Sequence, residues 1–132
     1  FIDNKGKILV NEVAPRPHNS GHHTIESVIT SQYEQHLRAI LDLPLGSTHL
    51  KMPAVMVNLL GEKGFKGPVK YEGLTECMAI EGVKIHVYGK KVTWPMRKMG
   101  HVTVMSENLE KAIENAQKVK DTIKVKSWKG NQ

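Results

Sequence analysis

The chain has 132 residues, of which 39% are hydrophobic and 24% charged, and its formal net charge is +6. This composition excludes a disordered chain, and no apolar run approaches the ~20 residues of a membrane span. The lone Cys77 excludes an internal disulfide framework and fits a reducing cytoplasm.

The positive charge is concentrated in the second half of the chain. Residues 67–132 contain 12 Lys/Arg and 7 Asp/Glu, whereas residues 1–66 contain 7 and 6. A basic half suits an anionic ligand such as a nucleotide or a sugar phosphate. Almost no aromatic residues lie among these lysines, so the pattern argues against nucleic-acid binding.

The N-terminal part predicts a hairpin and one helix. Residues 1–13 read as strand, turn and strand, with an Asn and a Gly supplying the tight turn. Residues 24–29 are ambiguous between strand and helix. Residues 31–41 predict a helix, because apolar side chains recur on one face and Ser31 and Glu34 form a capping-box pair.

Beyond Gly46 the pattern predicts a β-rich region with one helix. The expected strands cover residues 54–60, 83–88, 100–105 and 123–128. Three glycines and a proline make 61–68 a loop. A helix should run from a Ser106 cap to about Thr122, with its apolar stripe at Leu109, Ile113, Ala116 and Val119. Strands with two helices and no βαβ alternation indicate an α+β fold.

A dense polar run, NEVAPRPHNSGHHT (Asn11 to Thr24), follows the first apolar strand. A carboxylate at Glu12 needs a partner there. A divalent cation such as Mg²⁺ would suit it, as would an ion pair with Arg16 or a hydrogen-bonded turn. Arg16 itself lies between two prolines, and its planar guanidinium suits phosphate or carboxylate.

The histidines of this run also fit two readings. His18 and His22 have the spacing of zinc ligands on a helix, but the intervening Asn-Ser-Gly breaks helices and no convincing third ligand follows. A structural, hydrogen-bonded role for His22 and His23 is equally compatible with the pattern. The sequence therefore argues against zinc without assigning a base.

Lys90 and Arg97 form a second group. Lys90 follows a strand at a glycine turn, and Arg97 opens the next strand region, so both cations could converge on one phosphate. Composition alone favours the simpler reading, which is two solvated surface cations.

Three segments carry a resemblance: the polar run, TSQYEQHLRAILDLPLG (Thr30 to Gly46) and YGKKVTWPMRKMGHV (Tyr88 to Val102). Together they resemble the C-terminal part of the N5-carboxyaminoimidazole ribonucleotide synthetase family, ATP-grasp enzymes of purine biosynthesis. The resemblance implies that residues 1–45 complete an ATP-grasp catalytic domain. It also implies that residues 46–132 form a small barrel- or sandwich-like β-rich domain with a helix near its end.

The resemblance further implies an ATP-dependent carboxylase. Bicarbonate would attack the γ-phosphate of ATP to give carboxyphosphate, and 5-aminoimidazole ribonucleotide would take up the carboxyl group. Mg²⁺, a homodimer and a cytoplasmic location are implied as well. We expect the 132 residues alone to be part of a larger enzyme and to release no ADP, because adenine contacts and a second metal carboxylate are missing.

The family pattern assigns roles to seven residues of this chain. Metal and ATP contacts would fall to Asn11 and Glu12, with Glu12 as the metal ligand, and Arg16 would hold the γ-phosphate or the carboxyphosphate. The ribonucleotide would meet His18 and Asn19, with its 5′-phosphate on Lys90 and Arg97. One departure puts the direction of Arg97 in doubt, because Met96 stands where the family commonly has Gly.

Two other functions remain open from the sequence. The chain could come from another ATP-grasp carboxylase or ligase, although the pair of cations favours a phosphorylated acceptor. It could also be a non-enzymatic basic binding module.

Overall fold

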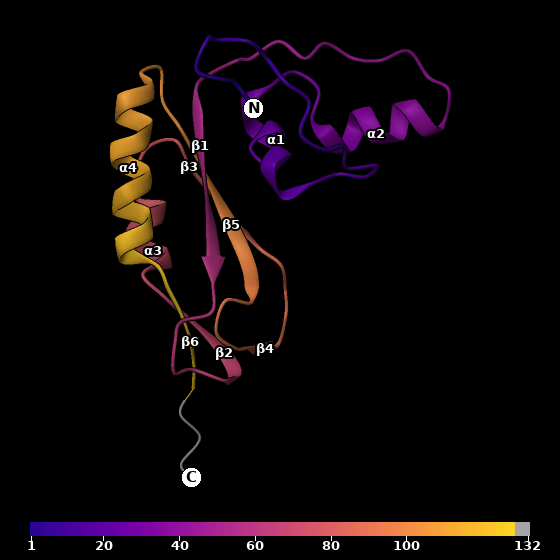
Figure 1. Ribbon diagram of the computed structural model, residues 1–132. Coiled ribbons are helices and arrows are strands. Elements are labelled where there is room, and N and C mark those ends of the chain that lie inside the picture. The colour runs from indigo at the N-terminus through magenta and orange to yellow at the C-terminus, as the bar shows by residue number, and fades with distance from the viewer. Residues whose placement is uncertain (129–132) are drawn as a thin grey trace.

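The computed structural model describes residues 1–128 and shows a mixed α and β architecture, as predicted (Figure 1). The helices are η1 (Asn19–Gly21), α1 (Thr24–Ser27), α2 (Gln32–Ile40), α3 (Leu74–Met78) and α4 (Leu109–Thr122). The strands are β1 (Ala54–Leu60), β2 (Gly67–Glu72), β3 (Val83–Val87), β4 (Val92–Thr93), β5 (Lys98–Met105) and β6 (Lys124–Ser127). The last four residues of the predicted second domain lie outside the described part.

The larger sheet contains β1, β5 and β3, in that order, and both pairs of strands are antiparallel. Helix α4 lies along one face of this sheet (Figure 1). Val102 and Val104 of β5 are fully buried there and share a core with Ala116 and Val119 of α4. Because side chains alternate along a strand, the residues between these valines point to the opposite face.

A second three-stranded sheet has the order β4, β2 and β6. An isolated bridge between Gly61 and Val125 connects the end of β1 to β6. Gly61 is required at this point, since a Cβ atom there would lie 2.1 Å from the carbonyl oxygen of Trp94. Both sheets are open.

Three elements between Gly61 and Lys98 were not predicted: β2, α3 and the two-residue β4. The predicted loop at 61–68 stops at Lys66, because Gly67 and Pro68 already belong to β2, where they pair with β4. Helix α3 begins after Gly73, whose φ of 79° suits only the permissive backbone of glycine. Cys77 on α3 is fully buried in the core.

Helix α4 begins later than predicted. Its N-cap is Asn108, whose side chain accepts hydrogen bonds from the amides of Glu110 and Lys111, so the prediction of a Ser106 cap is wrong. The predicted stripe is half wrong, because Leu109 and Ile113 are about half exposed. The face that packs on the sheet consists of Ala112, Asn115, Ala116 and Val119.

The N-terminal hairpin is shorter than predicted. Ile2 and Ile8 form a single bridge, and the amide of Leu9 donates to the carbonyl of Phe1 at 2.9 Å. Residues 10–18 pair with no strand among residues 1–128. The side chains of Val10 and Val13 are more than 80% exposed. The second strand of the predicted hairpin therefore does not continue past Leu9.

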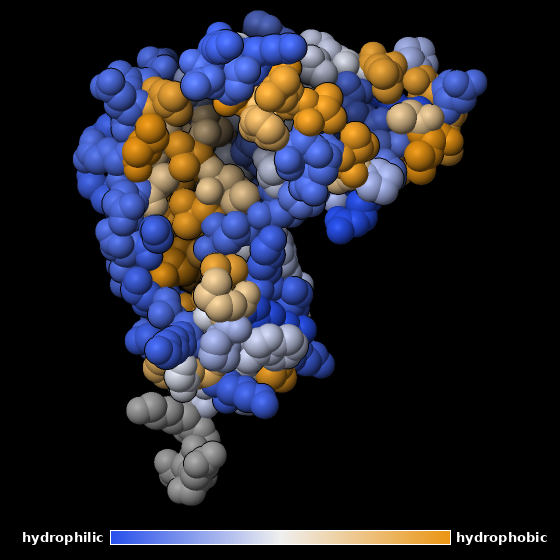
Figure 2. Space-filling model, in the orientation of Figure 1, coloured by the Kyte–Doolittle hydropathy of each residue, from blue (hydrophilic) through white to orange (hydrophobic). Residues whose placement is uncertain are grey.

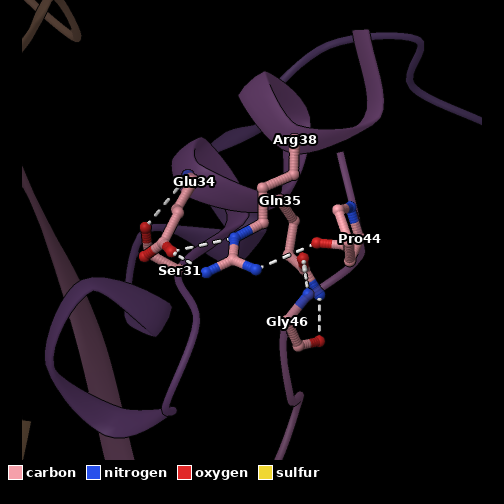
Figure 3. Close-up of polar contacts among 6 residues, drawn as sticks. All are labelled: Ser31, Glu34, Gln35, Arg38, Pro44 and Gly46. Atoms are coloured by element: carbon pink, nitrogen blue, oxygen red, sulfur yellow. Dashed lines mark hydrogen bonds and ion pairs between the residues drawn. The ribbon is translucent and has the colours of Figure 1, made fainter. Parts of the chain in front are cut away.

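Helix α2 carries the predicted cap and ties down the segment that follows it (Figure 3). Ser31 accepts a hydrogen bond from the amide of Glu34, and Glu34 pairs with Arg38 at 2.7 Å. Gln35 exchanges two hydrogen bonds with the backbone of Gly46. The ambiguous stretch before α2 is helical in α1 and extended from Val28 on.

Large apolar side chains remain exposed around α2. Figure 2 shows apolar surface over this part of the molecule. These residues are more than half exposed: Leu37, Ile40, Leu41, Leu43 and Leu45. No helix in the part of the chain that the structure describes has the length and apolar character to cross a membrane.

Candidate functional site

A row of three polar side chains crosses the larger sheet. His101 of β5 stands opposite Asn58 of β1 on one side and opposite His86 of β3 on the other. Directly opposite residues of antiparallel strands share a face. This face is turned away from α4, because His101 alternates with the core residue Val102.

The first two helices cover this polar row (Figure 1). Asn19 donates a hydrogen bond from Nδ2 to Oδ1 of Asn58 at 2.8 Å. His22 packs its ring on His101, with ring centroids 4.9 Å apart. Glu26 places Oε1 2.6 Å from Nε2 of His86.

The contacts across the row follow a helical spacing. Asn19, His22 and Glu26 come at i, i+3 and i+7, which places them on one side of the η1–α1 stretch. The polar loop of the sequence is therefore joined to the sheet through matched polar partners.

His101 is the buried centre of this cluster. Its side chain is 2% exposed, and burial, followed by the neighbouring His86 and His22, lowers its pKa to about 4. The ring is thus neutral at neutral pH. Nδ1 lies 2.9 Å from the hydroxyl of Tyr88. Among the described residues, neither Nε2 of His101 nor Oε2 of Glu26 has a hydrogen-bond partner, although both atoms are buried.

His18 caps η1 and leaves one ring nitrogen for other contacts. Its Nδ1 accepts from the amide of Ser20 at 3.3 Å and lies 2.9 Å from the Ser20 hydroxyl. Because an atom that accepts an amide hydrogen bond carries no proton, the neutral ring has its proton on Nε2. The His18 side chain is exposed, so this N–H is available to a ligand.

The two predicted cations, Lys90 and Arg97, lie near the first residue of β5. Lys90 donates to the carbonyl of Lys98 at 2.6 Å and lies 5.6 Å from the ring centre of Tyr88. Arg97 donates to the carbonyl of Val92 and stacks on Trp94, with 3.8 Å between the guanidinium carbon and the ring centre.

Lys90 is connected to the polar loop by a series of contacts. Lys90 contacts Tyr88, and the hydroxyl of Tyr88 contacts His101, on which His22 packs. The charge of Lys98 is also near enough to help burial lower the pKa of His22. Two sequence motifs about 70 residues apart thus meet through Tyr88 and the buried His101, whereas Arg97 contacts Val92 and Trp94.

The backbone before Arg97 has the conformation that glycine favours. Met96 has φ of 65°, in the left-handed region that costs an ordinary residue about 1–2 kcal/mol. Its side chain is 72% exposed. The turn therefore has a shape that glycine favours, although Met96 stands there.

The three candidate residues nearest the N-terminus are less constrained. Asn11, Glu12 and Arg16 are all exposed. Within residues 1–128 Glu12 forms no ion pair, so the alternative of a pair with Arg16 is not realised, and Arg16 donates only to the carbonyl of Pro17 at 3.2 Å. Arg16 and its flanking prolines line an open hollow of about 560 Å³.

Few side chains of this chain could bind a metal ion together. Within the described residues, no group of three or more His, Cys, Asp or Glu side chains could hold a metal ion. A lone carboxylate with a neighbouring amide, as at Glu12 and Asn11, fits Mg²⁺ as a partial site. This ion commonly takes one or two carboxylates together with substrate phosphates.

Sequence reasoning missed most of the buried cluster. Alternation within the strand predicted at 83–88 puts His86 and Tyr88 on one face, but the sequence gives no indication that β3 pairs with β5. Glu26 and His101 carried no motif at all. The alternation of polar and apolar residues within 100–105 places His101 on the face opposite Val102 and Val104, and gives no sign that the N-terminal helices bury it.

Two protein-family models match this chain. The ATP-grasp domain matches residues 1–33, and the phosphoribosylaminoimidazole carboxylase C-terminal domain matches residues 54–115. The ATP-grasp match thus lies at the start of this chain, and the match to the carboxylase C-terminal domain follows it.

Curated relatives agree with these matches. The N5-carboxyaminoimidazole ribonucleotide synthase of Aquifex aeolicus is 44% identical over 94% of this chain and 32% of its own length. The chloroplastic phosphoribosylaminoimidazole carboxylase of Vigna aconitifolia is 47% identical over 87% of this chain and 21% of its own length. The chain thus spans about a third or less of the relatives it matches.

Solved structures show the same similarity. A synthetase from Thermotoga maritima superposes with a TM-score of 0.93 at 59% identity, covering 97% of this chain and 36% of the other. A synthase from Aspergillus clavatus, in complex with ADP and 5-aminoimidazole ribonucleotide, gives a TM-score of 0.77 at 35% identity. It covers 92% of this chain and 32% of the other.

Proposed function

Because the chain is similar over nearly all its length to the C-terminal third of N5-carboxyaminoimidazole ribonucleotide synthetases, we propose that the whole protein is such an enzyme. It would carboxylate the exocyclic amine of 5-aminoimidazole ribonucleotide at the expense of ATP. The observation that carries the proposal is the packing of the His18–His22 loop against the sheet that ends in Lys90 and Arg97.

The reaction has two transfers. An oxygen of bicarbonate attacks the γ-phosphorus of ATP, ADP leaves, and carboxyphosphate forms. The amine nitrogen of the ribonucleotide then bonds to the carboxyl carbon, either of carboxyphosphate or of CO₂ released from it. Phosphate leaves and the nitrogen loses a proton. Positioning and charge neutralisation supply most of the rate enhancement in such phosphoryl transfers.

On the ribonucleotide side, four residues act together. His18 and Asn19 would face the aminoimidazole ribonucleotide, with the exposed Nε2–H of His18 as a donor. Lys90 and Arg97 would hold the 5′-phosphate, and their contacts with Lys98 and Val92 support this role because they limit the freedom of two long side chains.

On the ATP side, Asn11 and Glu12 would bind the nucleotide phosphates and Mg²⁺. The ion, when bound, neutralises charge on the phosphoryl oxygens. Arg16 would hold the γ-phosphate or the carboxyphosphate, since its guanidinium can bind two oxygens at once. The exposure of all three residues supports an open surface that can accept these ligands.

The proposal includes the organisation of the whole protein. Residues 1–45 would belong to the catalytic domain and 46–132 to the C-terminal domain. We also propose a homodimer, supported by the exposed apolar side chains around α2, and a cytoplasmic location, supported by the free, buried Cys77. A monomer in sedimentation of the whole protein would contradict the dimer.

The test is ADP release by the whole protein with ATP, bicarbonate and 5-aminoimidazole ribonucleotide. We expect turnover to depend on the ribonucleotide, and Lys90→Ala to raise its KM about tenfold or more, as expected for a lost phosphate contact. Lys91→Ala is the matched control, because Lys91 is adjacent but exposed. Ribonucleotide-independent ATP hydrolysis, or equal effects of both variants, would contradict the proposal.

A further inference from the structure

The side-chain amide of Gln32 binds both backbone groups of His18. Oε1 accepts from the amide of His18 at 2.8 Å, and Nε2 donates to its carbonyl oxygen at 2.8 Å. The oxygen must face the N–H group and the nitrogen must face the carbonyl, so the orientation of this amide is fixed. Gln32 is the first residue of α2, which gives it a rigid base.

The same nitrogen also reaches His22. Nε2 of Gln32 lies 2.8 Å from Nδ1 of His22, and the hydroxyl of Tyr33 lies 2.8 Å from the same atom. An amide nitrogen can only donate, so Nδ1 of His22 must accept and cannot carry a proton. The neutral ring therefore has its proton on Nε2.

Gly21 allows this close approach. A Cβ atom at Gly21 would lie 2.5 Å from Oε1 of Gln32, which is shorter than any real contact of that kind. Gln32 therefore fills the inside of the loop and contacts it at His18, Gly21 and His22.

We propose that Gln32 is the positioning residue of the ribonucleotide-binding loop, fixing the backbone at His18 and keeping Nδ1 of His22 unprotonated. The identity of the ligand rests on the proposed function. The contacts of Gln32 with His18 and His22, which we call the clamp, do not. Asn19 and His18 are held by this loop, and His22 packs on His101 beside Tyr88. A shift of the loop would move His18 and Asn19 relative to Lys90.

Several charged or titratable groups surround His22. They come from four elements: His18 of the loop, Tyr33 of α2, His86 and the adjoining Tyr88 from β3, and Lys98 and His101 of β5. Burial is the largest cause of the lowered pKa of His22, followed by Lys98, His18 and His86. No carboxylate is among the causes of this shift.

The test is Gln32→Glu in the whole protein. Glutamate keeps an oxygen for the amide of His18 but replaces the donor that faces His22 with a second oxygen. A carboxylate beside Nδ1 should raise the midpoint of His22 titration by about 1–3 pH units, followed by NMR of labelled histidine. The KM for 5-aminoimidazole ribonucleotide should rise about tenfold or more, with the KM for ATP changed less than about twofold.

Gln35→Glu is the matched control. Gln35 lies on the same helix and clamps Gly46 through the same two kinds of backbone contact, at 2.7 and 2.8 Å (Figure 3). It should lose one backbone contact but leave the titration of His22 unchanged. Both substitutions add a negative charge near the N-terminus of α2, which the helix dipole favours, so we expect both variants to fold.

The outcomes separate the two proposals. An unchanged His22 midpoint in Gln32→Glu, or an equal shift in Gln35→Glu, overturns the clamp. A shifted midpoint with an unchanged ribonucleotide KM overturns the positioning role. If the unsubstituted protein does not use the ribonucleotide at all, the proposed function fails, whereas the His22 titration still decides whether the clamp exists.

Discussion

The Nε2 atom of His86 lies 2.6 Å from Oε1 of Glu26, although the two residues are 60 positions apart in the sequence. Glu26 belongs to α1 and His86 to β3, so this contact joins the N-terminal part of the chain to the larger sheet. The neighbouring ring of His101 stacks on His86 at 4.4 Å between ring centres. This polar pair, like the hydrogen bond between Asn19 and Asn58, thus joins the two parts, and it lies beside a buried, neutral histidine.

Removal of Glu26 should weaken this connection. Glu26→Ala leaves Nε2 of His86 without its acceptor, and hydrogen bonds that involve a charged group contribute about 1.5–3 kcal/mol. We expect a loss of about 1–2 kcal/mol in the free energy of unfolding, measured by urea denaturation of the whole protein. Glu110→Ala, at an exposed position of α4, should cost much less; equal losses would show that the contact is not stabilising.

His101 should make the protein sensitive to acid. Its pKa is lowered from 6.5 to about 4 in the folded protein, so the unfolded chain binds the proton more readily. Stability is complete above pH 6.5, falls as the pH drops from about 6.5 to 4, and is not reduced further by this group below pH 4. The loss should be about 3 kcal/mol.

The measurement is the urea midpoint as a function of pH. His101→Phe keeps an aromatic ring but cannot titrate, so its midpoint should fall less steeply than that of the unsubstituted protein between pH 6.5 and 4. Parallel curves for the two proteins would assign the acid sensitivity to other groups. His22, whose pKa is also lowered, contributes in the same direction.

Met96 should tolerate glycine better than a β-branched residue. Its φ of 65° costs an ordinary residue about 1–2 kcal/mol, and glycine removes that cost while losing about 0.5–1 kcal/mol of backbone entropy. Met96→Gly should therefore raise stability by up to about 1 kcal/mol, and Met96→Val should lower it by at least that amount. Thermal unfolding measures both.

Met78 provides the comparison for this experiment. Its side chain is 71% exposed, much like that of Met96, but it lies in α3 with helical backbone angles. Met78→Gly should lower stability by about 0.5–1 kcal/mol. A loss of the same size at Met96 would show that the backbone there is not strained.

Glu12 should matter for turnover and not for folding. It is exposed and forms no ion pair within residues 1–128, so Glu12→Ala should leave the thermal midpoint unchanged. As a proposed ligand of Mg²⁺, its loss should reduce ADP release about 100-fold, or about 2.7 kcal/mol. Glu107→Ala controls for loss of one exposed carboxylate, and full activity of Glu12→Ala would remove Glu12 from the metal site.

The local pattern of the sequence determined much of the fold. A continuous apolar run located β1, alternation located β3 and β5, and the Ser31 cap located α2, because these signals depend on residues close together in the chain. The motifs around Asn11 to Thr24 and Tyr88 to Val102 led to the family that the comparisons then matched. The short elements β2 and α3 were missed because a Gly-Pro start and a five-residue helix carry little periodic signal.

Only the tertiary structure decided which polar residues meet. The pairing of β3 with β5, and the seating of α1 on their polar face, bring Glu26, His86 and His101 together. Strand order and the burial of a histidine depend on contacts between distant segments. No pattern of neighbouring residues in the sequence indicates these contacts. The exposed side of α4 was predicted wrongly for the same reason. The sheet that packs on the helix selects the buried face, and the spacing of apolar residues along the helix does not decide it alone.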